Sequence, residues 1–334
     1  MKSCFILCIL LNILFLTGCR NEKSYVVEGN IEGLTSSAIY VVSTFDNKTK
    51  IDTLFAKEGK FKFVSSYDSV KPIIIYMEEQ TVWITVWVQN GETITIAGNV
   101  NHPELIEITG NEINNLLTEF KQYNKEVNKD TLIYRAECFV EEHPASIAAL
   151  VVIQDYLMEN EHPDVLGTYL SSIENPAKQD LLYARLNAVY HRLLQTSIGN
   201  LAPDFSVVDV KGDTLTLKTF KDRCLLLAFE SFACKSYDNN FPVLKKIDKK
   251  YSDKKLAVLS IAFDEDNVDW KEISKKYNIL WLQVIDRQGL ASPLLTQYNV
   301  NVLPDYFLID NQGKIIAAHD SITKIETILK EHIK

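Results

Sequence analysis

The sequence predicts a multidomain protein in which an N-terminal all-β sandwich or barrel and a helical connector precede a C-terminal α/β domain with a central mixed sheet. Three observations support this fold class. Hydrophobic residues follow a strand-like pattern to about residue 110 and a helical period to about residue 197, and beyond that point strands and helices alternate. With 334 residues, 46% of them hydrophobic, the chain is long enough to build several cores.

The N-terminus is predicted to be an export leader. Lys2 supplies a positive charge, and residues 4–16 form an apolar run of the length found in the centre of a signal peptide. The same run is too short to cross a bilayer comfortably as a helix, which disfavours a membrane-spanning anchor.

The Leu-Thr-Gly-Cys stretch at residues 16–19 resembles a bacterial lipobox. The resemblance implies a signal peptide over residues 1–18, a lipid-modified Cys19 and a tether over residues 19–24. Because Arg20 rather than aspartate follows the cysteine, it also implies a lipid-anchored protein of the cell envelope, at the outer membrane and facing the periplasm or the cell surface.

The charge of the chain argues against nucleic acid as a partner. Its formal net charge is −9, and no cluster of Lys and Arg interrupts that acidity, so nucleic acid is not expected as a partner. Contact with the membrane is expected through the lipid on Cys19. The histidines lack the spacing of metal ligands, and no phosphate-binding glycine loop occurs, so we expect no cofactor and no metal.

Residues 25–110 are predicted to form the β-rich domain. Short runs of β-branched and aromatic residues lie between turn residues, at 50–55, 60–64, 72–77, 83–89 and 92–97. Asn90-Gly91 predicts a hairpin that joins the last two of these strands. Trp83 and Trp87 share one face; core or inter-domain packing is favoured for them, and a ligand-binding surface is the alternative.

Residues 111–197 are predicted to be a connector of four or five short helices. Apolar residues recur at helical spacing, for example at Ile113, Leu117 and Phe120. Prolines at 144, 163 and 176 are expected at helix starts. Cys138 lies among apolar residues and is expected to be a small buried residue.

From residue 198 onward, strands and helices alternate, which predicts a sheet covered on both faces. The Asn-Gln-Gly turn at 311–313 predicts an antiparallel edge formed by the last two strands. The predicted strands are 206–210, 214–217, 224–230, 256–262, 281–285, 306–310 and 314–318, and the predicted helices are 235–251, 269–277, 290–298 and one from 321.

Five stretches in this region occur in the order seen in a known family, namely 199–205, 225–229, Cys234 with Pro242, 302–310 and 311–316. Together they resemble the thioredoxin fold of the thiol–disulfide oxidoreductases of the peroxiredoxin and cytochrome-maturation type, over residues 198–334. A β-rich module of unknown function followed by helices, as here, is similar to the layout of lipoproteins of Bacteroides-like bacteria.

The resemblance implies a set of site residues. Cys234 stands where the family has its nucleophilic cysteine, and Pro304 stands where it has a cis-proline that packs against the sulfur and presents a strand edge to peptides. The implied partners are thiols or peptide segments of exported proteins. Tyr237 stands in place of the resolving cysteine, so dithiol cycling is not expected.

Further departures affect the acid/base chemistry of the site. Ala228 stands where many members carry a buried acid, and Asn240 where this group often carries a glutamate, so no acid/base partner of the thiol is expected. The acidic stretch at 264–266 is interpreted as a solvated loop. Cys224, at the far end of the predicted strand about 20 Å away, is expected to be buried and not to substitute as a resolving cysteine.

Three functions remain open for this Cys-Lys-Ser-Tyr sequence. A helix N-terminus and the adjacent Lys235 favour a thiolate, so Cys234 could act as a monothiol in disulfide exchange. Alternatively, Cys234 is inert beneath Tyr237 and the fold serves as a non-catalytic binding module. One-cysteine peroxidase chemistry is the weakest of the three.

Overall fold

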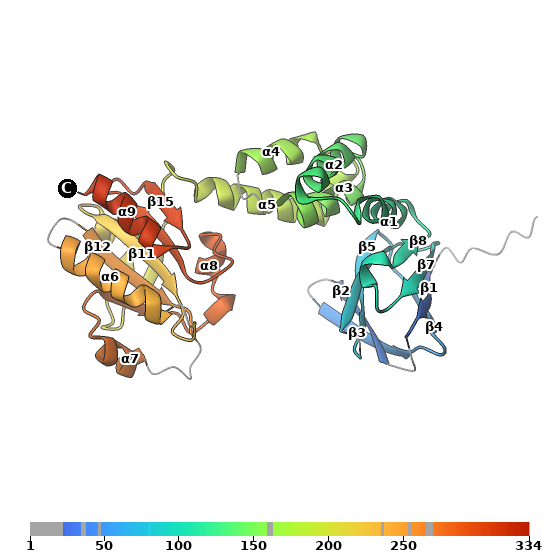
Figure 1. Ribbon diagram of the computed structural model, residues 1–334, viewed down its shortest axis with the longest axis horizontal. Coiled ribbons are helices and arrows are strands. Elements are labelled where there is room, and N and C mark those ends of the chain that lie inside the picture. Colours follow the sequence, from blue (N-terminus) through green and yellow to red (C-terminus); the bar gives the residue numbers. More distant parts are fainter. Residues whose placement is uncertain are drawn as a thin grey trace, which may run out of the picture. The chain divides into compact units, whose positions relative to one another are not determined.

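The computed structural model describes residues 23–34, 38–45, 48–79, 81–158, 163–234, 237–252, 256–264 and 270–333 (Figure 1). The predicted signal peptide and Cys19 lie outside these residues, so the lipid anchor stays a prediction. The chain divides between Val152 and Ile153 into two compact units, and each is described by itself. Within the described residues, no helix combines the length and apolarity needed to cross a membrane.

The first unit contains two four-stranded sheets around one apolar core, which confirms the predicted N-terminal β-rich fold. The sheet orders are β4-β1-β7-β8 and β3-β2-β5-β6. Alternation along the strands sets the core: in β5, Ile73, Ile75 and Met77 are fully buried while Ile74 is exposed. The strands are β1 Tyr25–Glu32, β2 Ala38–Phe45, β3 Lys48–Phe55, β4 Lys60–Ser65, β5 Lys71–Met77, β6 Val82–Val88, β7 Thr93–Asn99 and β8 Glu107–Thr109.

The prediction of a hairpin at Asn90-Gly91 is wrong, because the two strands that flank the turn, β6 and β7, belong to different sheets. β6 pairs with β5, whereas β7 runs parallel to β1. The turn itself is present, with Gly91 at φ 85°, but its amide donates to Ser24 O at 2.9 Å and directs the chain toward β1. Burial of both strands against the shared core therefore outweighs the local preference of Asn-Gly for a hairpin.

The two tryptophans of β6 differ in environment although they share one face. Trp87 is 5% exposed, in line with the packing role predicted for it. Trp83 is 73% exposed, so the core role predicted for it is wrong. The reason is that α1 (Glu112–Asn124) binds β6 at Trp87, near the end of the strand. Trp83 lies near the start of the strand beside Tyr76, with ring centroids 6.2 Å apart.

Helix α1 is fastened to the β-strands by two buried side chains. The Asn114 amide accepts from Trp87 N at 3.1 Å and donates to Trp87 O at 2.8 Å. The Thr118 hydroxyl accepts from Ile108 N at 3.0 Å and donates to Ile108 O at 2.8 Å. These bonds satisfy backbone groups at the strand edges that would otherwise be buried without partners.

Helices α2 (Lys129–Glu142) and α3 (Ile147–Val152) complete the first unit. Cys138, on α2, is half-buried and hydrogen-bonded to the Tyr134 hydroxyl, so the prediction of a buried apolar residue is wrong. The second unit opens with a π-helical turn at Ile153–Leu157, then α4 (Pro163–Ser172) and α5 (Leu181–Gln195). Helices therefore do lie between the two β-containing regions, as predicted.

The second unit then forms a five-stranded mixed sheet in the order β13-β12-β11-β14-β15. The pairs β11–β12 and β12–β13 are parallel, and β14 and β15 are antiparallel, which confirms the predicted mixed sheet with an antiparallel edge. The strands are β9 Ser206–Val208, β10 Thr214–Thr216, β11 Cys224–Glu230, β12 Leu256–Ala262, β13 Leu282–Ile285, β14 Asp305–Ile309 and β15 Ile315–His319.

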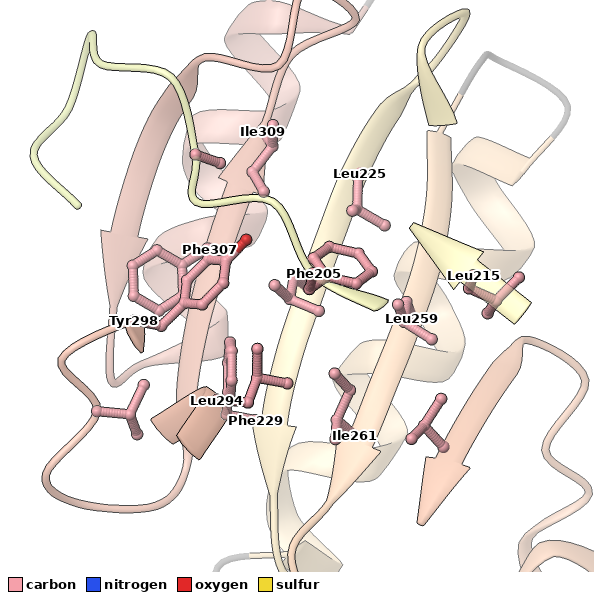
Figure 2. Packing of buried hydrophobic residues seen from close by; sticks show 14 of the residues in the cluster. Phe205, Leu215, Leu225, Phe229, Leu259, Ile261, Leu294, Tyr298, Phe307 and Ile309 are labelled. Atoms are coloured by element: carbon pink, nitrogen blue, oxygen red, sulfur yellow. The ribbon is translucent and has the colours of Figure 1, made fainter. Parts of the chain in front are cut away.

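Both faces of this sheet are covered, as predicted. The residues of one cluster come from β11, β12 and β14 together with α6 (Tyr237–Tyr251) and α9 (Ile322–His332). On the other face, Phe205, Leu215 and Tyr298 belong to a second cluster, in which the Tyr298 ring packs against Phe229 and Phe307 and Leu215 lies on the side of Leu259 (Figure 2). The central strand β11 is therefore buried on both sides, which fits its unbroken apolar sequence.

The predicted helix at 290–298 is divided into a 3₁₀ turn at Gly289–Ala291 and α8 at Pro293–Gln297. Pro293 has no amide hydrogen and begins a new helix, which Ser292 caps by accepting from Leu294 N. Helix α7 covers Trp270–Tyr277. Ahead of β9, Gly199 N donates to Ile315 O at 2.7 Å, which ties the start of the domain to its last strand.

Candidate functional site

Cys234 lies in the turn between the carboxyl end of β11 and the start of α6. Its amide donates to Ser231 O at 3.2 Å, which closes the turn, and its side chain is half-buried. Lys235, Ser236 and the side chain of Tyr237 lie outside the described residues, so their influence on the thiol stays a prediction. Catalytic side chains commonly occupy such loops at the carboxyl ends of parallel strands.

The structure brings Cys234 next to the segment that contains Pro304. The Cys234 Sγ lies 3.9 Å from Leu303 O, a contact between residues 69 positions apart. The Leu303–Pro304 peptide bond is cis. Pro304 directly precedes β14, and Asp305 pairs with Phe229 of β11, so the sheet register places the two segments together.

Asp264 holds the loop that leads to Cys234. It follows β12, is 5% exposed, and accepts from Ser231 Oγ at 2.7 Å and Phe232 N at 2.9 Å, with Ala233 N at 3.4 Å. The interpretation of this residue as part of a solvated loop is therefore wrong. Donors from the facing loop explain how a carboxylate is tolerated there.

Glu230, the last residue of β11, is a buried acid that the sequence analysis missed. It is 3% exposed, and Tyr306 Oη donates to its Oε1 at 3.4 Å. The pKa of Glu230 is raised to about 8, chiefly by burial; the Tyr306 hydrogen bond lowers it, and the charge of Asp264 contributes to the rise. Glu230 is therefore a buried titratable acid four residues before Cys234, and the expectation that the thiol has no acid/base partner stays a prediction.

The position of Glu230 follows from strand alternation. Leu226, Ala228 and Tyr306 belong to the cluster beneath α6, and Glu230 continues the same face of β11 two residues beyond Ala228. The carboxyl therefore lies two residues beyond Ala228, the position at which many family members are expected to carry a buried acid. An acid that ends an otherwise apolar central strand is the sequence feature that would have identified it.

Tyr306 connects Glu230 to α6. Its hydroxyl is hydrogen-bonded to Glu230 and to the side chain of Asn240, in the first turns of α6. The pKa of Tyr306 is raised by burial and then by the neighbouring charge of Glu230, and the Asn240 bond lowers it. Asn240, which replaces an expected acid, therefore takes part in a polar chain that ends at Glu230.

The remaining cysteine of this unit lies at the opposite end of β11. Cys224 is the first residue of the strand, and it is half-buried rather than fully buried as predicted. Burial and then the charge of Asp310 raise the pKa of Cys224, while a backbone hydrogen bond at Asn311 lowers it. Cys138, Cys224 and Cys234 are all free.

Two family models match the chain. Residues 25–117 match a domain of unknown function, DUF4369, and residues 198–318 match the AhpC/TSA family. The thiol-disulfide oxidoreductase ResA of Bacillus thuringiensis is 33% identical over 119 residues, which are 36% of this chain and 67% of that protein. The thioredoxin-like protein YneN of Bacillus subtilis is 30% identical over 132 residues, 38% of this chain and 75% of that protein.

Solved structures also resemble part of the chain. A thiol-disulfide oxidoreductase from Bacteroides fragilis is 34% identical and matches 40% of this chain and 100% of its own, with a TM-score of 0.38. The thioredoxin domain of a thiol-disulfide oxidoreductase from Bacteroides vulgatus is 24% identical and matches 41% of this chain and 99% of its own, with a TM-score of 0.38. Through its thioredoxin-like C-terminal domain, the chain belongs to the thiol–disulfide oxidoreductases of the AhpC/TSA family.

Proposed function

We propose that this chain is an exported, lipid-anchored protein that exchanges disulfides through the single thiol of Cys234. Its partners are thiols or peptide segments of other exported proteins. One observation carries the proposal: the half-buried Cys234 thiol lies against Leu303 O. The turn that carries it is held by a hydrogen bond from Phe232 N to Asp264. The leader and Cys19 support the export part of the proposal from the sequence alone.

The proposed reaction has two exchange steps. The Cys234 thiolate attacks one sulfur of a partner disulfide, so that a new S–S bond forms and the other partner sulfur leaves as a thiolate that takes a proton from solvent. A low-molecular-weight thiolate then attacks the partner sulfur of the mixed disulfide and releases Cys234. The small thiol ends up bound to the partner by a disulfide, and Cys234 is regenerated. An outside thiol is needed because Tyr237 replaces the resolving cysteine.

A second function, binding without catalysis, is favoured by one observation in the first unit. Tyr40, Tyr76 and Trp83 form a row across three strands, with ring centroids 6.3 and 6.2 Å apart, and Trp83 is 73% exposed. Exposed aromatic rings of this kind are common at binding surfaces. In this alternative Cys234 is inert and the domain serves only recognition.

The two functions are separated by trapping a mixed disulfide. The protein from residue 20 onward, with Cys138→Ser and Cys224→Ser, is incubated at pH 7 with a cystine-containing peptide and analysed by intact mass spectrometry. We expect one peptide adduct, at Cys234, that persists until a small thiol is added. In the matched variant Tyr237→Cys the adduct should be resolved without added thiol. A folded protein that forms no adduct would support binding alone.

A further inference from the structure

Two buried carboxyl groups lie beneath the loop that carries Cys234. Glu230 is 3% exposed and Asp264 is 5% exposed. We propose that the pair shares one proton in the sense that Glu230 is protonated at neutral pH while Asp264 accepts the hydrogen bonds that anchor the loop, which makes Glu230 a positioning residue for Cys234. The effect on reactivity rests on the proposed function, whereas the sharing of the proton does not.

The sheet register places the two groups close together. Glu230 is paired with Ala262 on the neighbouring parallel strand, and Phe263 N donates to Glu230 O at 2.9 Å. Asp264 is the next residue along, and its charge acts on Glu230. Burial is the main reason that Glu230 retains a proton, and the negative charge of Asp264, which follows the neighbouring strand, adds to it.

The hydrogen bonds decide which of the two is protonated. Asp264 accepts from Ser231 Oγ and Phe232 N at 2.7 and 2.9 Å, and donors to a carboxylate stabilise its ionised form. Glu230 accepts from Tyr306 Oη at the longer distance of 3.4 Å. The hydrogen-bond donors therefore gather at Asp264, and the proton of the pair is assigned to Glu230.

Ionisation of Glu230 would act on the site by two routes. The titratable groups that act on Glu230 are Asp264, which follows β12, and Tyr306 on β14. Tyr306 is in turn affected by Asp305 on β14 and by the polar Asn240 on α6. A second negative charge would weaken the hold of Asp264 on the loop before Cys234. It would also shift the Tyr306–Asn240 bond at the start of α6, the helix that follows Cys234.

The protonation of the pair is tested directly by carbon-13 NMR of the glutamate carboxyls in the protein from residue 20 onward. The Glu230 signal is identified by its absence in Glu230→Gln. We expect it to titrate with a midpoint near pH 8, and we expect Asp264→Asn to lower that midpoint. A Glu230 midpoint near the ordinary value of about 4.3 would overturn the shared proton.

The positioning role is tested by the rate of Cys234 alkylation between pH 5 and 10 in the Cys138→Ser, Cys224→Ser background. We expect an inflection near pH 8, in addition to that of the thiol, which Glu230→Gln removes and the exposed control Glu331→Gln leaves in place. An inflection that survives in Glu230→Gln would overturn the positioning role. A thiol that does not react in the folded protein would contradict the proposed function, and the carboxyl titration would still decide the shared proton.

Discussion

At the scale of single residues, the chemistry of the site depends on carboxyl groups that are removed from water. Glu230 ends a strand that is buried on both faces, and Asp264 accepts hydrogen bonds from the loop ahead of Cys234. The thiol can therefore be presented by a short, fixed loop although no second cysteine follows it at position 237.

The raised pKa of Glu230 predicts a loss of stability with rising pH. Its pKa is about 8 when folded and near 4.5 when unfolded, so the folded state binds more protons in between. The contribution is fully present below pH 4.5 and is lost toward pH 8, at roughly 1.4 kcal/mol per pH unit. Glu230→Gln should remove this slope. Urea unfolding at pH 5, 6, 7 and 8, followed by the methyl NMR signals of Leu226 and Leu259, measures it; equal slopes in both proteins would refute the prediction.

Ser231→Ala should weaken the anchor of the loop. It removes the 2.7 Å bond to Asp264, and a hydrogen bond to a charged group contributes about 1.5–3 kcal/mol. We expect a loss of that order in the free energy of unfolding of the second unit. The control is Ser171→Ala, whose hydroxyl bonds only Thr168 O on an exposed helix surface. Equal effects of the two substitutions would count against a structural role of the Asp264 contact.

Residue-scale features of the site were only partly predictable from the sequence. Cys234 and Pro304 stood out because motifs on both sides of them resemble a family. Glu230 and Asp264 did not, since their role depends on the pairing of β11 with β12, which brings two distant carboxyls under one loop. Burial of an acid is a tertiary property that no local pattern contains.

At the scale of secondary structure, close backbone contacts set where elements can begin. Gly110 joins β8 to α1 with φ at +119°, and a Cβ there would lie 2.1 Å from Thr93 O. Gly110→Ala should therefore lower the stability of the first unit by the strain of its backbone, about 1–3 kcal/mol, plus the cost of displacing β7.

Thermal unfolding of Gly110→Ala beside a matched control checks this prediction. Gly212 also has a positive φ, +96°, but nothing lies within 4 Å of a Cβ built there. Gly212→Ala should lose only the conformational part, about 1–2 kcal/mol. Equal losses in the two variants would mean that the contact with Thr93 is unimportant.

The strand and helix pattern was predictable element by element, whereas the partners of the strands were not. A run of β-branched and aromatic residues between turn residues identified β5, and the Asn-Gly turn was located correctly at residues 90–91. The strand that follows this turn nevertheless pairs with β1, because both bury apolar faces in the shared core. Local propensity specifies a turn, and the core specifies what the turn connects.

At the scale of the whole molecule, two compact units carry different kinds of surface. The first has a β-rich fold with an aromatic row in which the half-buried Tyr40 and Tyr76 lead to the exposed Trp83. The second carries Cys234 on a thioredoxin-like sheet. The order of domains was predictable from hydrophobic periodicity and from family resemblance, and the boundaries predicted after residues 110 and 197 stay predictions.

The central claim is that Cys234 is a working thiol in the folded protein. It is tested most directly by the alkylation rate of Cys234 at pH 7 in the Cys138→Ser, Cys224→Ser protein, measured folded and again in urea. We expect the folded protein to react at least as fast as the unfolded chain, because the thiol is half-buried beside Leu303 O and not enclosed in the core. Reaction only after unfolding would mean that Cys234 is inert in the folded protein, and would leave a binding protein with an inactive redox site.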